Sequence, residues 1–176
     1  IAQRTALRQA AEQAAQLDGP LTPFGAERQG DPAKGIPDWT GGLTQAPAGY
    51  GGPGSFHVDP FAGEQPLRVI DAQNLAADEA NLSHGVKALF KAYPQTFKVP
   101  VYPSHRSFAA PQEIYANTRR NAEQATLADG GNGLQGAYAG IPFPIPADGR
   151  EAIWNHIARW QGRYIDEVAI TAQVTA

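Results

Sequence analysis

The chain has 176 residues, enough for one domain with a hydrophobic core, and a formal net charge of −3 from 14 basic and 17 acidic residues. Because these charges are mixed along the chain, the composition argues against a protein that binds nucleic acid or an anionic membrane surface. The absence of cysteine excludes disulfides, thiolate metal sites and a cysteine nucleophile, and no apolar run approaches the length of a membrane span.

Residues 1–18 form the first predicted unit, an N-terminal helix. They are rich in strong helix formers, and a glycine and a proline follow in the order that ends helices. The apolar stripe is thin, which favours a peripheral helix or one that docks on a partner. Its members are Leu7, Ala10, Ala14 and Leu17.

Residues 19–70 are predicted to form a long extended arm rich in glycine and proline. Neither helical nor strand periodicity of apolar residues is present there, yet apolar residues recur between the turn signals. A disordered linker would be poor in such residues. We therefore expect the arm to lie across a surface and to dock through aromatic side chains, namely Phe24, Trp39, Tyr50, Phe56 and Phe61.

Residues 71–162 are predicted to be a helical and proline-braced covering region. One helix is expected from Asp71, with a restart at Ser83 and a stop at Pro94. A second should run from Pro111 to about Leu127. Its inward residues are expected to be Ile114, Tyr115, Thr118 and Ala122.

The third helix of this region has a clear start signal. Asp148 is placed to cap it and Glu151 to complete a capping box, while Gly162 should end it. Its buried stripe is expected to be Ile153, Ile157 and Trp160, flanked by Trp154.

The stretch AGIPFPIPADG, residues 139–149, predicts a stiff extended rod, because each proline removes a backbone donor and extends the residue before it. With a period near two, Ile141, Phe143 and Ile145 should point one way and the prolines the other. Such a ridge must rest on an apolar surface. The same reasoning applies to VPVYP at 99–103, with Val101 and Tyr102.

Residues 163–176 alternate as a strand should, but no second clear strand is visible upstream to pair with it. The chain also begins at Ile1 without a charged leader. We therefore expect the N-terminal portion of a larger protein, with a leader removed, that reaches only the first strand of its sheet.

No constellation of residues predicts an enzyme. Ser55, His57 and Asp59 would share one face of an extended segment, a poor geometry for a converging triad. The four histidines lack a metal-ligand spacing. His105 and Arg106 could face an anionic head group, although a packing role is favoured. Neither a catalytic residue, a metal nor a cofactor is predicted.

Several blocks resemble one Gram-negative family that carries a domain of unknown function, number 1329, often labelled outer membrane lipoprotein-sorting protein. The resemblance covers about residues 17–164. The blocks are LTPFGAER, IPDWTGGLT, DPFAGEQPL, KALFKAYPQTFKVPVYPSHR, APQEIYANTRRNA and GAYAGIPFPIPADGREAIWNHIARWQGRY. The resemblance implies export to the periplasm and association with the outer membrane. It also implies work beside an outer-membrane barrel protein and a resistance-nodulation-type inner-membrane exporter.

The resemblance further implies a C-terminal part similar to the lipoprotein carriers LolA and LolB, a curved antiparallel sheet whose concave face holds lipid. The expected fold is therefore α+β, with N-terminal helices and the extended arm packed on an unclosed antiparallel β-barrel of which only the first strand lies in this chain. The residues expected to cover its apolar face, or to contact a hydrophobic ligand, are Ile141, Phe143, Ile145, Val101, Tyr102, Trp154 and Trp160.

The favoured function is a periplasmic carrier or adaptor for lipids or other hydrophobic compounds. One alternative is a non-enzymatic interaction subunit whose arm and N-terminal helix wrap a membrane-protein partner. The other, less favoured, is a lipid or ester hydrolase built on Ser55, His57 and Asp59.

Overall fold

The structure, a computed structural model, describes residues 11–17, 19–165 and 167–173. Three α-helices are defined in it, α2 (His84–Ala92), α3 (Gln112–Gln124) and α4 (Gly149–Ile157), and residues 11–16 are also helical. The strands are β1 (Arg68–Ile70), β2 (Val99–Val101), β3 (Thr126–Ala128) and β4 (Gly133–Gln135). This mixture of helices and small antiparallel sheets confirms an α+β class at the coarse level.

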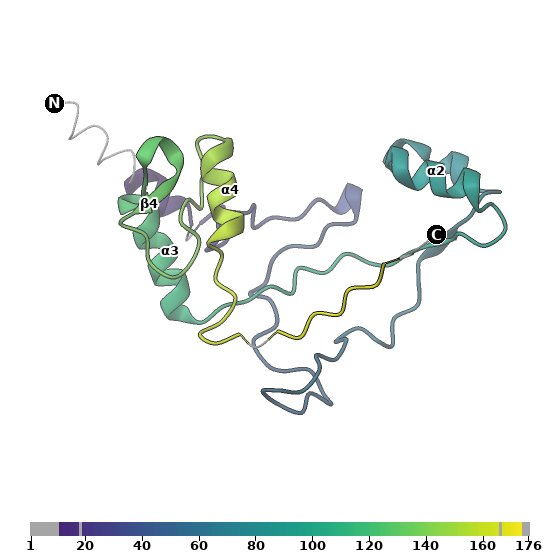
Figure 1. Ribbon diagram of the computed structural model, residues 1–176, viewed down its shortest axis with the longest axis horizontal. Coiled ribbons are helices and arrows are strands. Elements are labelled where there is room, and N and C mark those ends of the chain that lie inside the picture. Colours follow the sequence, from purple (N-terminus) through teal and green to yellow (C-terminus); the bar gives the residue numbers. More distant parts are fainter. Residues whose placement is uncertain (1–10, 18, 166, 174–176) are drawn as a thin grey trace.

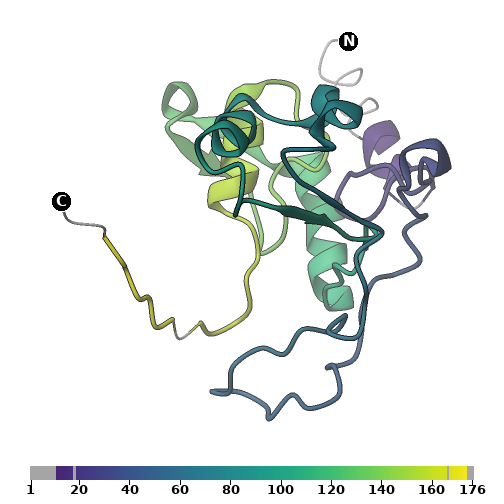
Figure 2. The same ribbon diagram turned by 90° about the vertical axis from the view of Figure 1, so that its right-hand side faces the viewer.

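The helices lie in two groups that are joined by extended chain. Figure 1 places α3, α4, β4 and the described N-terminal residues at one end of the long axis and α2 at the other. Extended segments run between the two groups. Figure 2 shows part of the arm, near residues 45–60, projecting as a loop away from both groups.

The core of the larger group forms around α3. Its buried residues are Ile114, Thr118 and Asn121, so the inward face predicted from Ile114 and Thr118 is confirmed, with Asn121 added to it. Ala14 and Leu17 of the predicted N-terminal stripe are also buried. The other two members of that stripe lie outside the described residues.

The proline rod rests on α3 of its own chain. The Thr118 hydroxyl accepts a hydrogen bond from the Ile141 N–H, and Asn121 Nδ2 donates to the carbonyl oxygens of Tyr138 and Ile141. On the side of α4, Asn155 Oδ1 accepts from the Phe143 N–H and its Nδ2 donates to the Phe143 carbonyl. The rod is therefore held by side-chain amides that replace the backbone pairing it lacks.

The predicted two-faced alternation of the rod is wrong. Phe143 is buried, but Pro142 and Pro144 are buried with it, while Ile141 and Ile145 are only half-buried. Because the rod passes between two helices and a turn of the arm, it is enclosed from several sides rather than lying flat on one surface.

The smaller group is a two-stranded sheet with α2. Strands β1 and β2 are antiparallel, with Val69 opposite Pro100. Ile70 and Phe90 are its buried residues, and Phe90 meets Phe97 edge to face, with ring centroids 4.8 Å apart. The VPVYP stretch is thus extended, as predicted, and both of its valines lie in β2.

Four short strands precede residue 163, although none of them pairs with the described residues beyond it. Strands β3 and β4 form a second antiparallel pair, with Leu127 opposite Leu134. Each strand has only three residues, so no period of two can be detected in the sequence. The hairpin also shortens α3, which ends at Gln124 instead of reaching Leu127.

The predicted helix starts agree with the structure more closely than the predicted helix lengths do. The Ser83 side chain accepts from the Val86 N–H and begins α2. Upstream, the chain forms the 3₁₀ turns η2 (Leu75–Ala77) and η3 (Glu79–Asn81) in place of an α-helix. The Asp71 carboxylate accepts from the N–H groups of Gln73 and Asn74 and so begins the first of these turns.

Helix α4 has the predicted N-cap, but Glu151 accepts from the Ala147 N–H instead of completing the capping box with Asp148, and the helix buries a different face. Asp148 Oδ1 accepts from the N–H groups of Arg150 and Glu151. Ile153 and Ile157 are 60% and 58% exposed, so the predicted buried stripe is wrong. Trp154 and Asn155 point inward instead, because they hydrogen-bond to the backbones of Gly131 and Phe143. The helix ends at Ile157, before Gly162.

The described residues beyond α4 run as extended, exposed chain. Val168 and Ile170 are 88% and 93% exposed, and no ladder partner pairs with 163–165 or 167–173 among the described residues. The strand predicted over 163–176 therefore stays a prediction, and positions 166 and 174–176 lie outside the described residues. Where the structure describes the chain, no helix is both long and apolar enough to cross a bilayer.

Candidate functional site

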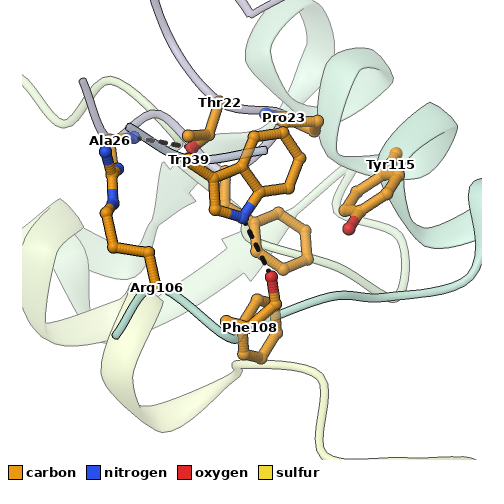
Figure 3. A pocket seen from close by; sticks show the side chains of 8 residues that line it. Thr22, Pro23, Ala26, Trp39, Arg106, Phe108 and Tyr115 are labelled. Atoms are coloured by element: carbon orange, nitrogen blue, oxygen red, sulfur yellow. Dashed lines mark hydrogen bonds between the residues drawn. The ribbon is translucent and has the colours of Figure 1, made fainter. Parts of the chain in front are cut away.

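A cavity of about 290 Å³ lies where the arm crosses the segment that leads into α3. The arm supplies one side, the extended residues before α3 supply the floor, and α3 itself closes the other side. Figure 3 shows Trp39 and Tyr115 on opposite sides, with Phe108 below them. The lining residues are Thr22, Pro23, Phe24, Ala26, Trp39, Arg106, Phe108 and Tyr115.

The walls of this pocket are mainly aromatic. The Phe24 ring lies 5.1 Å from the Phe108 ring and 5.3 Å from the Tyr115 ring, centroid to centroid. The contact with Tyr115 is edge to face, an arrangement that aromatic pairs favour. Phe108 remains 54% exposed, so it lies at the open side of the pocket.

The polar atoms of the walls are engaged in hydrogen bonds within the protein. Trp39 Nε1 donates to the Phe108 carbonyl at 3.0 Å. Tyr115 Oη accepts from the Ala110 N–H at 2.8 Å, and Thr22 Oγ1 accepts from the Ala26 N–H at 3.2 Å. The Trp39 N–H is therefore used, while the Tyr115 and Thr22 hydroxyls, which accept in these bonds, keep their own hydrogens for a ligand acceptor.

Arg106 ties the arm to the floor of the pocket. Its Nη1 donates to the Arg28 carbonyl at 2.9 Å, and its Nη2 donates to the Glu27 carbonyl. Figure 3 shows the side chain running from the floor toward Ala26, so that its stem lies along the wall. The guanidinium is therefore committed to the arm backbone, and the part of Arg106 that faces the cavity is largely aliphatic.

Two further contacts hold the arm in place. The Leu43 N–H donates to the Ser107 carbonyl at 2.7 Å. Next to it, Gly42 has a φ of +74°, and a Cβ there would lie 2.1 Å from the Phe108 carbonyl oxygen. Only glycine allows the backbone this close approach in this conformation.

The predicted arm aromatics differ in what they contact. Phe24 and Trp39 line the pocket. Phe61 stacks on His105 with centroids 3.7 Å apart, and His105 Nε2 lies 2.8 Å from a Glu64 carboxylate oxygen. Tyr50 stacks on His57 inside the projecting loop, at 5.8 Å. Phe56 is 97% exposed and has no docking surface in the described chain.

The residues predicted to cover a ligand are not brought together. Val101 and Tyr102 lie in and beside β2, in the smaller group. Ile141, Phe143 and Ile145 lie in the rod, and Trp154 lies on α4 with its indole N–H bonded to the Gly131 carbonyl. Trp160, past the end of α4, is half-buried.

The residues considered for catalysis have separate partners. The Ser55 hydroxyl donates to the Gly52 carbonyl, His57 stacks on Tyr50, and Asp59 Oδ1 accepts from the Phe61 N–H. Within the described part of the chain, no group of three or more histidine, aspartate or glutamate side chains is placed to hold a metal ion.

The sequence reasoning missed Phe108 and did not place Arg106 in an apolar wall. One signal was present. Arg106 and Phe108 are two residues apart in an extended stretch, so they share a face, and Tyr115 follows on the inward side of the next helix. Nothing in the sequence indicates that Trp39, 69 positions before Phe108, closes the same site.

Comparison with known proteins gives one family and one close relative. The family model described as "Protein of unknown function (DUF1329)" matches residues 69–176, more than half of the chain. A Pseudomonas aeruginosa protein named "Uncharacterized protein PA3922" is 45% identical over 152 residues. That match covers 86% of this chain and 33% of the relative, so the chain spans about a third of the relative's length. No solved structure matches.

Proposed function

The chain belongs to the family described as protein of unknown function DUF1329, and we propose that it binds hydrophobic molecules as a carrier or adaptor in the periplasm of Gram-negative bacteria. The observation that supports this most directly is the aromatic pocket between the arm and α3. Its walls present rings and methylene groups, and the polar atoms of Trp39 and Tyr115 each make a hydrogen bond within the protein. Apolar walls with few available polar groups are typical of sites for hydrophobic ligands.

In this proposal the rest of a longer family member forms a curved, unclosed antiparallel sheet similar to that of LolA and LolB. The face that meets it differs from the ridge expected from the sequence, since the rod is already enclosed by α3 and α4. The exposed apolar residues on α4 and in the extended chain after it are available for that contact. They include Ile153, Ile157, Val168 and Ile170.

Ligand binding is tested with the purified chain and an uncharged fluorescent probe, N-phenyl-1-naphthylamine. We expect saturable probe binding that a long-chain alcohol displaces, together with hydrophobic compounds in an organic extract of the same sample. A fluorescence signal that rises linearly with probe, with nothing extracted, would contradict the proposal. Cell fractionation of the full-length relative tests location: a cytoplasmic protein would contradict a periplasmic role.

A second candidate function is an interaction subunit that attaches to an outer-membrane barrel protein or a resistance-nodulation-type exporter. It is supported by the projecting loop of the arm (Figure 2), a segment to which the 97% exposed Phe56 belongs. Large apolar side chains exposed on a protrusion are typical of residues that bury on a partner.

This candidate is tested by replacing residues 46–58 of the loop with a short glycine-serine linker. Cross-linking to the co-expressed barrel protein should be lost while probe binding stays unchanged. Phe56→Ala should weaken the same cross-link, with the half-buried Tyr50, changed to alanine, as the matched control in the loop. A cross-link that survives loop replacement would exclude the loop as the attachment point.

A further inference from the structure

The volume of the aromatic pocket limits what it can hold. A dry apolar cavity of about 150 Å³ accommodates benzene. The pocket measures about 290 Å³, which matches a group of roughly twice that size. A bicyclic aromatic ring system or the end of a single acyl chain fits this space. A complete two-chain lipid does not.

The hydrogen bonds of the walls limit the chemistry of that group. Trp39 Nε1 and Tyr115 Oη are both bonded to the backbone of the floor segment, at Phe108 and Ala110. The Arg106 guanidinium bonds to arm carbonyls. A charged group inside the pocket would therefore lose its hydration and gain at most the hydroxyl hydrogens of Tyr115 and Thr22 in return.

The exposure of the lining residues shows where a polar head would lie. Phe108 and Ala26 are the exposed members of the lining, while Thr22 is buried. The mouth is thus bounded by Phe108 and Ala26, and Thr22 lies deep. A ligand with an apolar tail and a polar head would insert the tail and leave the head in solvent.

We propose that the pocket binds one uncharged apolar group at a time, a bicyclic aryl group or one acyl-chain end, through stacking against Phe24, Trp39, Phe108 and Tyr115, and without an ionic contact to the head group. This inference rests on the proposed function and narrows it from lipids in general to single-chain or aryl compounds. It also assigns Arg106 a structural role in holding the wall, rather than the recognition of an anionic head.

The size limit is tested with a series of straight-chain primary alcohols that displace the naphthylamine probe from the purified chain. Affinity should rise by about fourfold per methylene for the shorter members, as expected for burial of each CH₂, and then level off once the tail fills the pocket. Decanoate should bind within about threefold of decanol, because the guanidinium of Arg106, the cationic group among the lining residues, is bonded to two arm carbonyls. A rise that continues through the longest chains, or a decanoate preference of about tenfold or more, would overturn the inference.

The location is tested with a pocket-filling substitution and a matched control. Ala26→Leu adds volume at the mouth while keeping the backbone N–H that bonds to Thr22 Oγ1. The substitution should weaken decanol binding by about tenfold or more. Ala116→Leu, on the exposed side of α3, adds the same atoms away from the pocket and should leave the affinity for decanol unchanged. Both variants should keep the Tm of the parent within about 3 °C.

A measurement on the unmodified chain guards against a folding defect in Ala26→Leu. In a ¹⁵N–¹H spectrum, decanol should shift the indole signal of Trp39 and leave that of Trp154, which is bonded to Gly131, in place. Saturable binding with an unmoved Trp39 signal, or with full affinity in Ala26→Leu, would overturn the pocket assignment while the proposed function stands. No binding of probe or alcohol by the parent chain would overturn both.

Discussion

Gly25 of the arm and Pro144 of the rod touch backbone to backbone. A Cβ on Gly25 would lie 1.7 Å from the Pro144 carbonyl oxygen, and the φ of Gly25 is +86°. This contact joins segments that are 119 positions apart and fixes the turn from which Thr22, Phe24 and Ala26 line the pocket. It also explains why Pro144 is buried although the sequence pattern placed it outward.

The first prediction concerns this contact. Gly25→Ala should destabilise the protein by about 3 kcal/mol, since it adds a backbone clash to the cost of a positive φ. Gly35→Ala is the control, because Gly35 has a φ of +69° but nothing within 4 Å of an added Cβ. It should cost only about 1 kcal/mol. Urea unfolding of both variants measures the difference, and equal losses would show that the segments do not touch.

The second prediction concerns Asn121, which is 1% exposed and makes three hydrogen bonds, one to Ile141 of the rod and two to Tyr138 just before it. Asn121→Ala should cost about 2–3 kcal/mol, because it leaves the Tyr138 N–H and two carbonyl groups without their partner at a partly buried contact. As the control, Asn81→Ala at an exposed position should lower the free energy of unfolding by less than about 0.5 kcal/mol. Thermal unfolding compares them, and a loss as small as the control's would contradict the role given to Asn121.

The third prediction concerns the Arg106 clamp. Arg106→Lys keeps the charge and most of the stem but loses the planar fork that reaches the arm carbonyls. Amide exchange at Trp39 and Leu43, whose N–H groups bond to the Arg28 and Ser107 carbonyls, should therefore speed up by about tenfold or more.

Exchange within α2 serves as the internal control for this variant, because that helix lies in the other group (Figure 1). Its protection should not change. Unaltered exchange at both Trp39 and Leu43 would show that Arg106 does not hold the arm.

The fourth prediction separates hydrogen bonding from charge at the start of α4. Asp148→Ala should destabilise the protein by about 1 kcal/mol, because the N–H groups of Arg150 and Glu151 lose their acceptor. Asp148→Asn keeps an acceptor oxygen and should cost less than half as much. If the two variants are equally destabilised, the charge near the helix N-terminus matters more than the cap.

Local signals in the sequence predicted local structure well. Ser83 and Asp148 begin their helices as expected, because an N-cap depends on the side chain and the few residues after it. Pro111 likewise precedes the first turn of α3. These features involve neighbours in sequence, so no knowledge of the rest of the fold was needed.

Contacts between distant segments could not be predicted in this way. The inward face of α4 was assigned to its isoleucines, but Asn155 is turned inward by the Phe143 backbone, which lacks strand pairing. The partner of Asn155 is set by the path of the rod, and apolar periodicity carries no information about it. The three-residue strands could not be predicted from the sequence, because they are too short to show an alternation of apolar and polar residues.

The candidate site was anticipated only in part. Phe24 and Trp39 were expected to dock on a surface, and Tyr115 was expected to point inward. That the three meet around Phe108 depends on the close approach of Gly42 to the Phe108 backbone. Such an approach is a property of the folded chain, and a glycine in a glycine-rich arm does not reveal which segment it allows to come near.

Both ends of the projecting loop are fixed to one short segment. Leu43 is hydrogen-bonded to Ser107, and Phe61 is stacked on His105 two positions away. The chain between them therefore leaves and returns at nearly the same place, and halving its length would alter the closure free energy by only about 0.6 kcal/mol. The middle of the loop can thus be replaced without disturbing the contacts that hold the arm against residues 105–107.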